Sequence, residues 1–453
     1  MLSIQDRPRG APMLDRHSYR LVCGACGAEY VDDGLRLSCD VSHGPALLRT
    51  AYDSPRFAAQ APQDSIFRFG RWLPVVRTVP DSPGCVVYNA DRLAARIGLD
   101  DLWVAFSGYW PERGAHMPTG TFKDLEASTV LGRMPDNPPT LVLASAGNTA
   151  AAFARACSLN GVRCLIVVPG KVLHRLDFEE PPAECVQLVA LGGEATYDDA
   201  IVLAEAIGGL EGFQLEGGIR NVGRRDGLAT CLLAAFEKYG RLPNYYFQGV
   251  GSGAGAVAAH EAAGRLRLNG CPDAFPRLVL CQNAPFTPIH DLWTRDQRPD
   301  GGGPAVEPPG SAAAADQSAI TATELANSRP PYAVRGGIRE ILRESSGKAM
   351  AIPNLEVARA LHMFEEVEGI DIEAAAGVAL AGLTAMVGRG EVARHETVLL
   401  NVTGGGRARR GREVELKAAT PDLWVDVADV RDQSVLGATA ERVAGAIRPA
   451  LFT

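Results

Sequence analysis

The sequence lacks the segments that would carry a chain into or across a membrane. No run of about 18 apolar residues occurs. The opening residues, MLSIQDRPRG, carry charges and proline where a secretory signal peptide has its apolar core. Long basic stretches are also missing: the formal net charge is −8, and the short cluster Arg407–Arg412 is interpreted as a solvated turn. We therefore expect a cytoplasmic protein with no membrane and no nucleic-acid partner.

Cysteine is sparse, with ten residues in a chain of 453, which excludes a disulfide scaffold. Cys164, Cys231 and Cys281 lie in apolar segments and are interpreted as small buried side chains in a reducing compartment. The N-terminal cysteines differ, because their spacing is typical of one knuckle of a zinc ribbon. The ribbon's second pair is incomplete, since Ser42 stands where a cysteine is expected. The predicted ligands of a structural zinc are Cys23, Cys26, Cys39 and His43; the alternative is a metal-free relic.

Short apolar, β-rich runs alternate with alanine-rich amphipathic stretches from about residue 85 onward. Alternation of strand and helix predicts an α/β fold with mostly parallel sheets. The length exceeds that of one ordinary domain. The predicted parts are a flexible tail (1–17), a Cys-rich ribbon-like module (18–45), a larger lobe (46–125 and 215–453, with a mobile insertion at 298–316) and a smaller lobe (126–214).

The segment Pro118–Asp124 (PTGTFKD) places Lys123 at the start of a predicted helix. The N-terminal end of a helix disfavours a cation. A lysine whose amine forms a Schiff base with an aldehyde avoids this conflict, and the freed amine can act as a base. An ordinary surface lysine is the alternative, and it is the better interpretation of Lys123 taken alone.

A second segment, ASAGNTA at residues 144–150, follows a predicted strand and opens a helix. Ser145, Gly147 and Thr149 offer hydroxyls and an accessible backbone that would hold a carboxylate at the helix N-terminus. The Asn148 amide would donate a hydrogen bond to a phenolic oxygen. A simple helix-capping turn is the alternative, and it is the better interpretation of this segment considered by itself.

Two further glycine-rich turns close predicted strands. In GVGSGAG at 249–255, repeated glycine forms a backbone nest for a phosphate, with Gly251, Ser252, Gly253, Ala254 and Gly255 as the predicted contacts. A dinucleotide fingerprint is the alternative, but its third glycine is misplaced here and no acidic residue follows at the required distance. In the turn after residues 397–402, the Thr403 hydroxyl is placed to face the nitrogen of a bound pyridine ring; a plain glycine turn is the alternative.

In this order, the four segments resemble those of the fold type II pyridoxal-phosphate (PLP) enzymes, the tryptophan synthase β-like fold, and of their threonine-synthase-like branch in particular. The resemblance covers about residue 18 to about residue 412. Further segments are similar to the cysteate synthase family described from methanogenic archaea: YYFQGVGSGAGAVAAHE, QNAPFTPIHDLW, RPPYAVRGG and FEEVEGIDIEAAAGVA. The resemblance implies two open α/β lobes preceded by a small zinc-ribbon-like module, assembled as a homo-oligomer.

The resemblance also implies roles for individual residues. Lys123 would carry PLP as a Schiff base, with Phe122 beside it. Asn148 would meet the phenolic oxygen of the cofactor, and Thr403 its ring nitrogen. The glycine loop would hold its phosphate.

The implied reaction is a β-replacement on O-phospho-L-serine, in which sulfite displaces phosphate and L-cysteate forms. Lys123 would remove the α-proton. Such a site must hold several anions, and arginine reads oxyanions bidentately. Arg224 is the first choice for this role and Arg225 the second; a solvated loop with surface arginines is the alternative.

Other functions remain open at this point. Threonine synthase, which acts on O-phosphohomoserine, differs in substrate by one methylene, which a pocket distinguishes by only about 1–3 kcal/mol. A second open function is a related β-replacement reaction in a specialised pathway. A PLP-fold binding protein without activity would have no need of Lys123, and a nicotinamide enzyme would rest only on the glycine-rich loop.

Overall fold

The computed structural model describes residues 18–53, 56–60, 64–145, 147–298 and 319–452, with side chains as far as residue 447. The predicted tail at 1–17 lies outside these residues. So does the predicted insertion, apart from Arg298. Within the described residues, no helix combines the length and the apolar character needed to cross a membrane.

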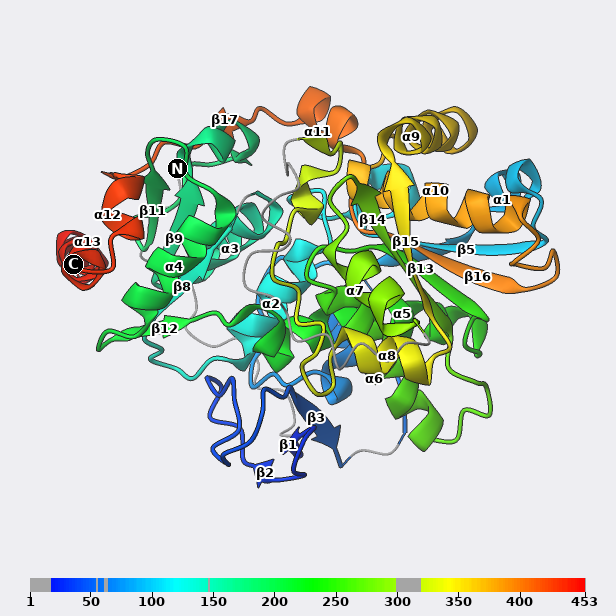
Figure 1. The fold of residues 1–453 in the computed structure, drawn as a ribbon, viewed down its shortest axis with the longest axis horizontal. Coiled ribbons are helices and arrows are strands. Elements are labelled where there is room, and N and C mark those ends of the chain that lie inside the picture. The colour runs from blue at the N-terminus through cyan, green and yellow to red at the C-terminus, as the bar shows by residue number, and fades with distance from the viewer. Residues whose placement is uncertain (1–17, 54–55, 61–63, 146, 299–318, 453) are drawn as a thin grey trace.

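Two mainly parallel sheets form the body of the chain (Figure 1). The larger has six strands in the order β15 (Lys348–Pro353), β14 (Arg277–Ala284), β13 (Tyr245–Gly249), β16 (Thr397–Val402), β5 (Asp101–Phe106) and β4 (Val86–Asn89), with β4 alone antiparallel. The smaller has five parallel strands in the order β12 (Phe213–Leu215), β8 (Thr140–Ala144), β9 (Cys164–Pro169), β11 (Val186–Leu191) and β18 (Leu423–Val425).

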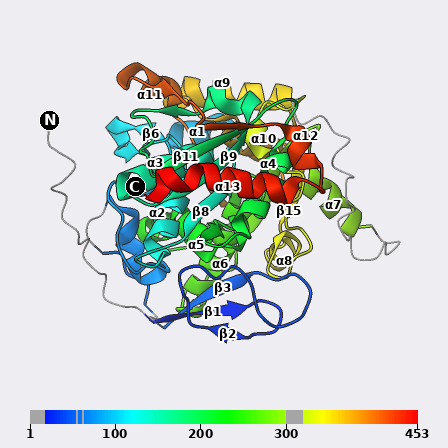
Figure 2. The ribbon, with the colours of Figure 1, turned by 90° about the vertical axis from the view of Figure 1, so that its left-hand side faces the viewer.

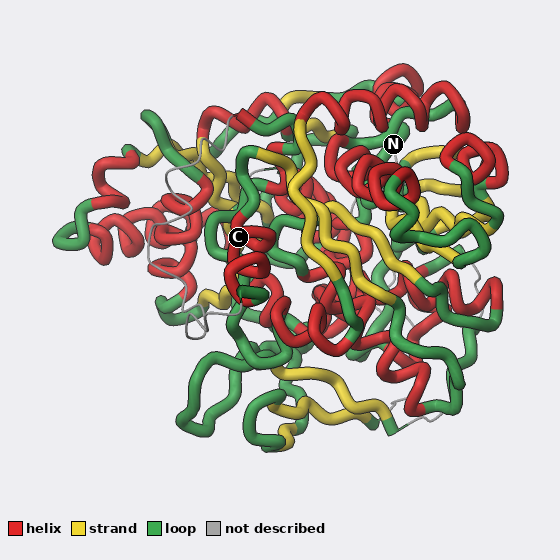
Figure 3. Tube along the Cα trace, turned by 45° about the vertical axis from the view of Figure 1, so that its right-hand side comes forward, coloured by secondary structure: helices red, strands yellow, loops and turns green. Residues whose placement is uncertain are grey.

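Helices cover both faces of each sheet, so the central strands are apolar throughout. Every residue of β9 (CLIVVP) and of β16 (TVLLNV) is buried, as expected of strands covered on two sides. Figure 3 shows strands of the larger lobe as a twisted layer between helices. The helices are α1 (Asp91–Ile97), α2 (Lys123–Arg133), α3 (Asn148–Asn160), α4 (Tyr197–Gly208), α5 (Val222–Tyr239), α6 (Ala254–Leu268), α7 (Pro288–Asp296), α8 (Ile338–Glu344), α9 (Asn354–Glu368), α10 (Ala374–Gly388), α11 (Arg407–Glu413), α12 (Val427–Arg431) and α13 (Leu436–Phe452).

Short elements complete the chain. The N-terminal module is an antiparallel sheet in the order β2 (Glu29–Tyr30), β1 (Tyr19–Cys23) and β3 (Leu48–Tyr52), at the bottom of Figure 1. The predicted end of the module at residue 45 was therefore wrong, because β3, assigned to the larger lobe, pairs with β1. Two two-stranded ribbons pair β6 (Tyr109–Trp110) with β7 (Ala115–His116), and β10 (Asp177–Phe178) with β17 (Lys417–Ala418). The 3-10 helices are η1 (Ile66–Trp72), η2 (Pro111–Arg113), η3 (Gly170–Arg175), η4 (Gly218–Arg220) and η7 (Thr323–Leu325).

The C-terminal segment departs from the predicted lobe boundaries. Residues 215–453 were assigned to the larger lobe, yet β18 is the edge strand of the five-stranded sheet, and α13 packs against α4 on that sheet (Figure 2). Val443, Ala444 and Ile447 of α13 are buried in the core of the smaller lobe. The assignment was wrong here because the chain returns to the smaller lobe after β16, which an alternating pattern alone does not reveal.

Candidate active site

A pocket of about 1070 Å³ opens between the two lobes, where parallel strands of both sheets end. It is lined by the segments that follow β8, β12, β13 and β16 and by the N-terminal turn of α2. Residues 38–47 of the N-terminal module add a further wall, apart from Asp40 and Ser42. The crevice beyond the carboxyl ends of parallel strands is the usual ligand site of open α/β folds.

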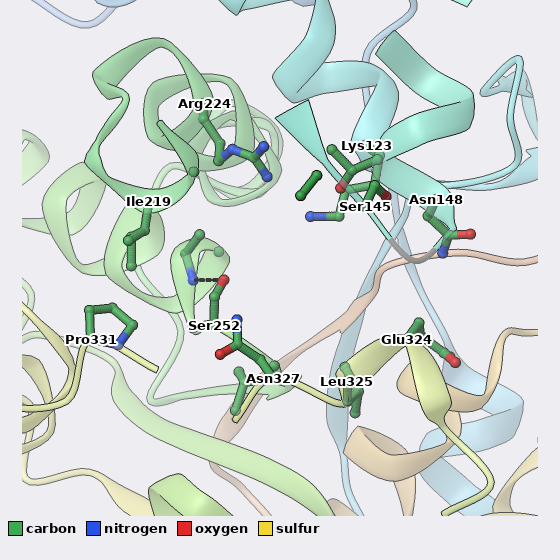
Figure 4. A pocket seen from close by; sticks show the side chains of 18 of the residues that line it. Lys123, Ser145, Asn148, Ile219, Arg224, Ser252, Glu324, Leu325, Asn327 and Pro331 are labelled. Atoms are coloured by element: carbon green, nitrogen blue, oxygen red, sulfur yellow. Dashed lines mark hydrogen bonds between the residues drawn. The ribbon is translucent and has the colours of Figure 1, made fainter. Parts of the chain in front are cut away.

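The turn before α2 is tied down on two sides, which directs Lys123 into the pocket (Figure 4). The Asp124 carboxylate accepts hydrogen bonds from the backbone N–H of Thr119 at 2.9 Å and from its hydroxyl at 3.0 Å. The backbone N–H of Phe122 donates to the carbonyl of Thr403 at 2.9 Å. The lysine turn is therefore fastened to the loop after β16.

The Lys123 amine has two neighbours within the described residues. Its Nζ lies 3.1 Å from Oε2 of Glu126, one turn along α2, and 4.9 Å from the centre of the Phe122 ring. Burial lowers the pKa of Lys123, and the nearby Glu126 carboxylate opposes that shift. An amine with a lowered pKa is suited to attack a carbonyl or to act as a base.

The loop after β8 brings four predicted residues to the pocket: Ser145, Gly147, Asn148 and Thr149. The Ser145 hydroxyl accepts from the backbone N–H of Gly147 at 3.2 Å and of Ala150 at 3.0 Å, which orders the start of α3. Asn148, the first residue of α3, donates from Nδ2 to Oε2 of Glu373 at 2.9 Å. Thr149 donates from its hydroxyl to Oε1 of Glu126 at 3.2 Å.

The glycine loop between β13 and α6 fits a phosphate group. Gly253 has φ 77°, a left-handed conformation that favours glycine, and α6 begins at the next residue, Ala254. The first N–H groups of a helix have no partner within it and carry partial positive charge. A Cβ on Gly251 would lie 3.2 Å from the Leu325 carbonyl oxygen, so a side chain there would crowd the backbone of Leu325.

Together these residues fit PLP. Lys123 supplies a primary amine for its aldehyde, the α6 loop suits its phosphate, and the buried Thr403 hydroxyl and the Asn148 amide suit its ring. All of them line the same pocket, as do Phe122, Ser252 and Gly255. The predicted cofactor residues are therefore brought together, although they come from four separate segments.

Arg224, the first choice for reading an oxyanion, lines the pocket from α5. Its Nε and Nη2 donate to Glu216 at 2.9 and 2.5 Å, and its Nη1 donates to Oε1 of Glu126 at 2.7 Å. These bonds use three N–H groups of the five that a guanidinium has. Among the described residues, the other two donate to no further acceptor.

Arg225, the second choice, does not reach the pocket, and that prediction was wrong. Its side chain is fully buried between the N-terminal module and α6. It donates to the carbonyl oxygens of Leu48 and Ile219 and forms an ion pair with Glu261 at 3.0 Å. Neighbouring residues of a helix point about 100° apart, so two consecutive arginines cannot both face one pocket.

Sequence reasoning missed the carboxylates of the pocket. Glu373 precedes α10 and lies against the loop after β16, since a Cβ on Gly404 would lie 2.5 Å from its Oε2. Burial, reinforced by the neighbouring Glu324, raises the pKa of Glu373 to about 8. Glu126 contacts Lys123 without lining the pocket, and its position three residues after that lysine was a signal in the sequence. Glu373 stands within the segment FEEVEGIDIEAAAGVA, and Glu216 stands eight residues before Arg224, but neither segment predicts a role for these carboxylates.

The predicted metal ligands also lie together. The donor atoms of Cys23, Cys26, Cys39 and His43 are all within 4.8 Å of one another. Cys26 and Cys39 Sγ are 3.6 Å apart, and Cys23 Sγ lies 3.3 Å from His43 Nε2. Donors around a tetrahedral zinc are roughly 3.5–3.8 Å apart, so the cluster fits that ion.

Comparison with known sequences places the chain among pyridoxal-phosphate-dependent enzymes. Residues 93–404 match the family described as pyridoxal-phosphate dependent enzyme. A cysteate synthase from Methanosarcina barkeri is 38% identical over 418 residues, covering 90% of this chain and 99% of that protein. A cysteate synthase from Methanoculleus marisnigri is 39% identical over 434 residues, covering 94% and 98%.

Solved structures share the fold at low sequence identity. Threonine deaminase isoform 2 from Solanum lycopersicum superimposes with a TM-score of 0.55 at 15% identity, over 79% of this chain and 96% of that one. Maize serine racemase gives a TM-score of 0.52 at 14% identity, over 72% and 90%. The predicted fold type II architecture is confirmed.

Proposed function

Because this chain belongs to the cysteate synthase family of pyridoxal-phosphate-dependent enzymes, we propose that it replaces the phosphate of O-phospho-L-serine with sulfite. The products are L-cysteate and inorganic phosphate. PLP, when bound, supplies an electron sink for the negative charge left on the α-carbon. The observation that carries the proposal is the convergence of Lys123, Asn148, Thr403 and the 251–255 loop on one pocket.

Each cofactor contact has a separate task. Lys123 would carry the cofactor through Nζ, and its freed amine would take the α-proton. The 251–255 loop would hold the cofactor phosphate through backbone N–H groups. Asn148 would donate to the phenolic oxygen, and Phe122 would lie beside Lys123. The Thr403 hydroxyl would serve the ring nitrogen and, unlike a carboxylate, would not hold it protonated.

Substrate binding is assigned to the loop after β8 and to α5. Ser145, Gly147 and Thr149 hold the substrate carboxylate at the start of α3. Arg224 holds the leaving phosphate, and then the incoming sulfite, through its two remaining N–H groups. Its ion pairs with Glu126 and Glu216 fix the guanidinium before the ligand arrives.

A substrate comparison tests the proposal. The holoenzyme is incubated with O-phospho-L-serine plus sulfite, with O-phospho-L-serine alone, and with O-phosphohomoserine alone. Phosphate release and the amino acid formed are then measured. We expect L-cysteate from the first mixture; phosphate release only from O-phosphohomoserine, with threonine as product, would show a threonine synthase instead.

Three companion proposals concern the whole chain. A zinc ion is held by Cys23, Cys26, Cys39 and His43. Its role is structural, because PLP chemistry itself requires no metal. The enzyme is a homo-oligomer, and it acts in the cytoplasm. Light scattering of the purified protein and metal analysis test the first two.

A further inference from the structure

Glu126 is a fully buried carboxylate in contact with the proposed base. Its Oε2 accepts from Lys123 Nζ at 3.1 Å. Its Oε1 accepts from Arg224 Nη1 at 2.7 Å and from the Thr149 hydroxyl at 3.2 Å. One side chain therefore touches the residues proposed to move the proton, to read the anion and to hold the substrate carboxylate.

The charged side chains around Glu126 form a row in which positive and negative groups alternate. Lys123 is paired with Glu126, Glu126 with Arg224, and Arg224 with Glu216, so two cations face two anions. The side chains of Glu126, Glu216 and Arg224 are at most 9% exposed. Buried charges interact more strongly than exposed ones, so a change at one member is felt by the next.

We infer that Glu126 is a positioning residue that sets how strongly Lys123 holds a proton and couples this base to the anion at Arg224. The inference rests on the proposed function and adds to it a residue that no motif contains. Removing the Glu126 charge would leave burial and the Arg224 cation, which both favour the neutral Lys123 amine, opposed by the Glu216 carboxylate alone among the groups that act on its pKa.

This arrangement matters at the proton-transfer step. When the Cα–H bond of the substrate breaks, the proton forms a new N–H bond on Lys123 Nζ. The electron pair of that bond, for which bound PLP would supply the sink, becomes the second pair of the Cα=Cβ double bond when the Cβ–O bond breaks, and the electron pair of the Cβ–O bond leaves with the phosphate. Lys123 is an ammonium after this step. Glu126 stabilises it at hydrogen-bond distance, while Arg224, on the other oxygen of Glu126, faces the departing phosphate.

Lys123 can be titrated directly, because the chain has only five lysines: Lys123, Lys171, Lys238, Lys348 and Lys417. Full-length protein freed of PLP by hydroxylamine is labelled with trace acetic anhydride across a pH series, and the peptides are quantified by mass spectrometry. We expect Glu126→Gln to lower the pKa of Lys123 by about 1–3 units, the usual effect of one close opposite charge. The other four lysines serve as internal controls.

A matched variant and a conservative one complete the design. Glu356→Gln removes a carboxylate that pairs with Arg359 on the outside of α9, and it should leave Lys123 unchanged. Glu126→Asp keeps the negative charge but moves it away from Lys123, because the side chain is one methylene shorter. The pKa of Lys123 should therefore fall by less than in Glu126→Gln. Should Glu126→Gln not fold, Glu126→Asp carries the test.

The holoenzyme gives an independent readout. Exchange of the L-serine α-hydrogen with deuterated solvent, followed by NMR, reports proton abstraction without phosphate release. Its pH profile should shift to lower pH in Glu126→Gln. An unchanged Lys123 titration together with an unchanged exchange profile would overturn the inference. A chain that makes no cysteate would instead refute the proposed function and leave the Lys123 titration result intact.

Discussion

At the scale of single residues, Lys123 is the amine on which the proposed chemistry depends. Lys123→Ala should abolish the absorbance of bound cofactor near roughly 410–430 nm and lower turnover by at least about 10²–10⁴-fold, the usual contribution of a general base. Absorbance spectra and phosphate release measure the two effects. Lys348→Ala, which removes an exposed partner of Glu391, is the control and should retain both. Full turnover in Lys123→Ala would refute the assigned role.

Glu373 should make the stability of the cofactor-free protein depend on pH. Its pKa is raised to about 8 in the fold, whereas an ordinary glutamate in an unfolded chain titrates near about 4.3. Between these values the folded state holds a proton that the unfolded state has lost. The free energy of unfolding therefore falls as pH rises through this window, by at most about 1.4 kcal/mol per pH unit from this group, and levels off above about pH 8.

Glu373→Gln tests that dependence, because glutamine stays neutral at every pH and keeps the hydrogen-bonding shape. The melting temperature of the variant should fall less than that of the wild type between pH 5 and pH 8. Glu356→Gln, an exposed substitution, should follow the wild type. Parallel wild-type and Glu373→Gln curves would show that Glu373 is already ionised throughout the range.

Whether a site residue can be predicted from the sequence depends on whether it belongs to a local pattern. Lys123, Asn148 and Thr403 stand in glycine-rich turns that follow strands, and the parallel fold brings the ends of such strands together. Glu373 meets Asn148 across 225 positions and Glu126 meets Arg224 across 98. Nothing local announces such pairs. Arg225 shows the opposite failure, because the pattern favoured two arginines while the helix allows one to face the pocket.

At the scale of elements, a buried ion pair fastens the N-terminal module to the helix that begins with Lys123. Arg133, the last residue of α2, donates to Asp32 from Nε and Nη2, both at 2.7 Å, and to the Asn221 side chain at 2.9 Å. The Asp32 and Arg133 side chains are 3% and 1% exposed. Asn221 caps α5, the helix of Arg224, so the pair joins the module to the two helices that supply Lys123 and Arg224.

Removing one member of this pair should be costly. Asp32→Ala leaves the Arg133 guanidinium buried without its carboxylate, and we expect a loss of about 3–5 kcal/mol in the free energy of unfolding. Thermal or denaturant unfolding measures it. Asp136→Ala, which removes the 94% exposed partner of Arg77, is the matched control and should cost less than about 1 kcal/mol. Equal effects in the two variants would contradict a structural role for the Asp32–Arg133 pair.

Element types were easier to predict than their assignment to lobes. Runs such as CLIVVP and TVLLNV are apolar over their whole length and form covered parallel strands. β18 is only Leu423–Val425, too short to carry a pattern, and it joins its sheet through a long-range pairing with β11. The sheet partner of so short a strand is decided by packing between distant segments.

At the scale of the whole molecule, three parts of the chain meet at one pocket. Both lobes line it, and so do Cys39 and His43 of the N-terminal module. Leu47 is held from both directions, since its backbone N–H donates to the Arg335 carbonyl at 2.9 Å and its carbonyl accepts from Gly24 at 3.0 Å. An ion that fixes Cys39 and His43 would therefore also fix a wall of the pocket.

Metal removal should consequently affect binding as well as stability. Purified protein should contain about one zinc per chain, and a strong chelator or Cys26→Ser should remove it and lower the melting temperature. Because Cys39 and His43 line the pocket but are assigned neither to the cofactor nor to the proton transfer, KM for O-phospho-L-serine should rise by a larger factor than kcat falls. Cys271→Ser, outside the cluster, is the control and should change neither the melting temperature nor KM. Metal analysis, thermal unfolding and steady-state kinetics on the same samples separate the outcomes. Loss of zinc without any change in KM would mean that the ion supports the module alone. Zinc-free native protein with a normal melting temperature would mean that the four ligands form a metal-free knuckle.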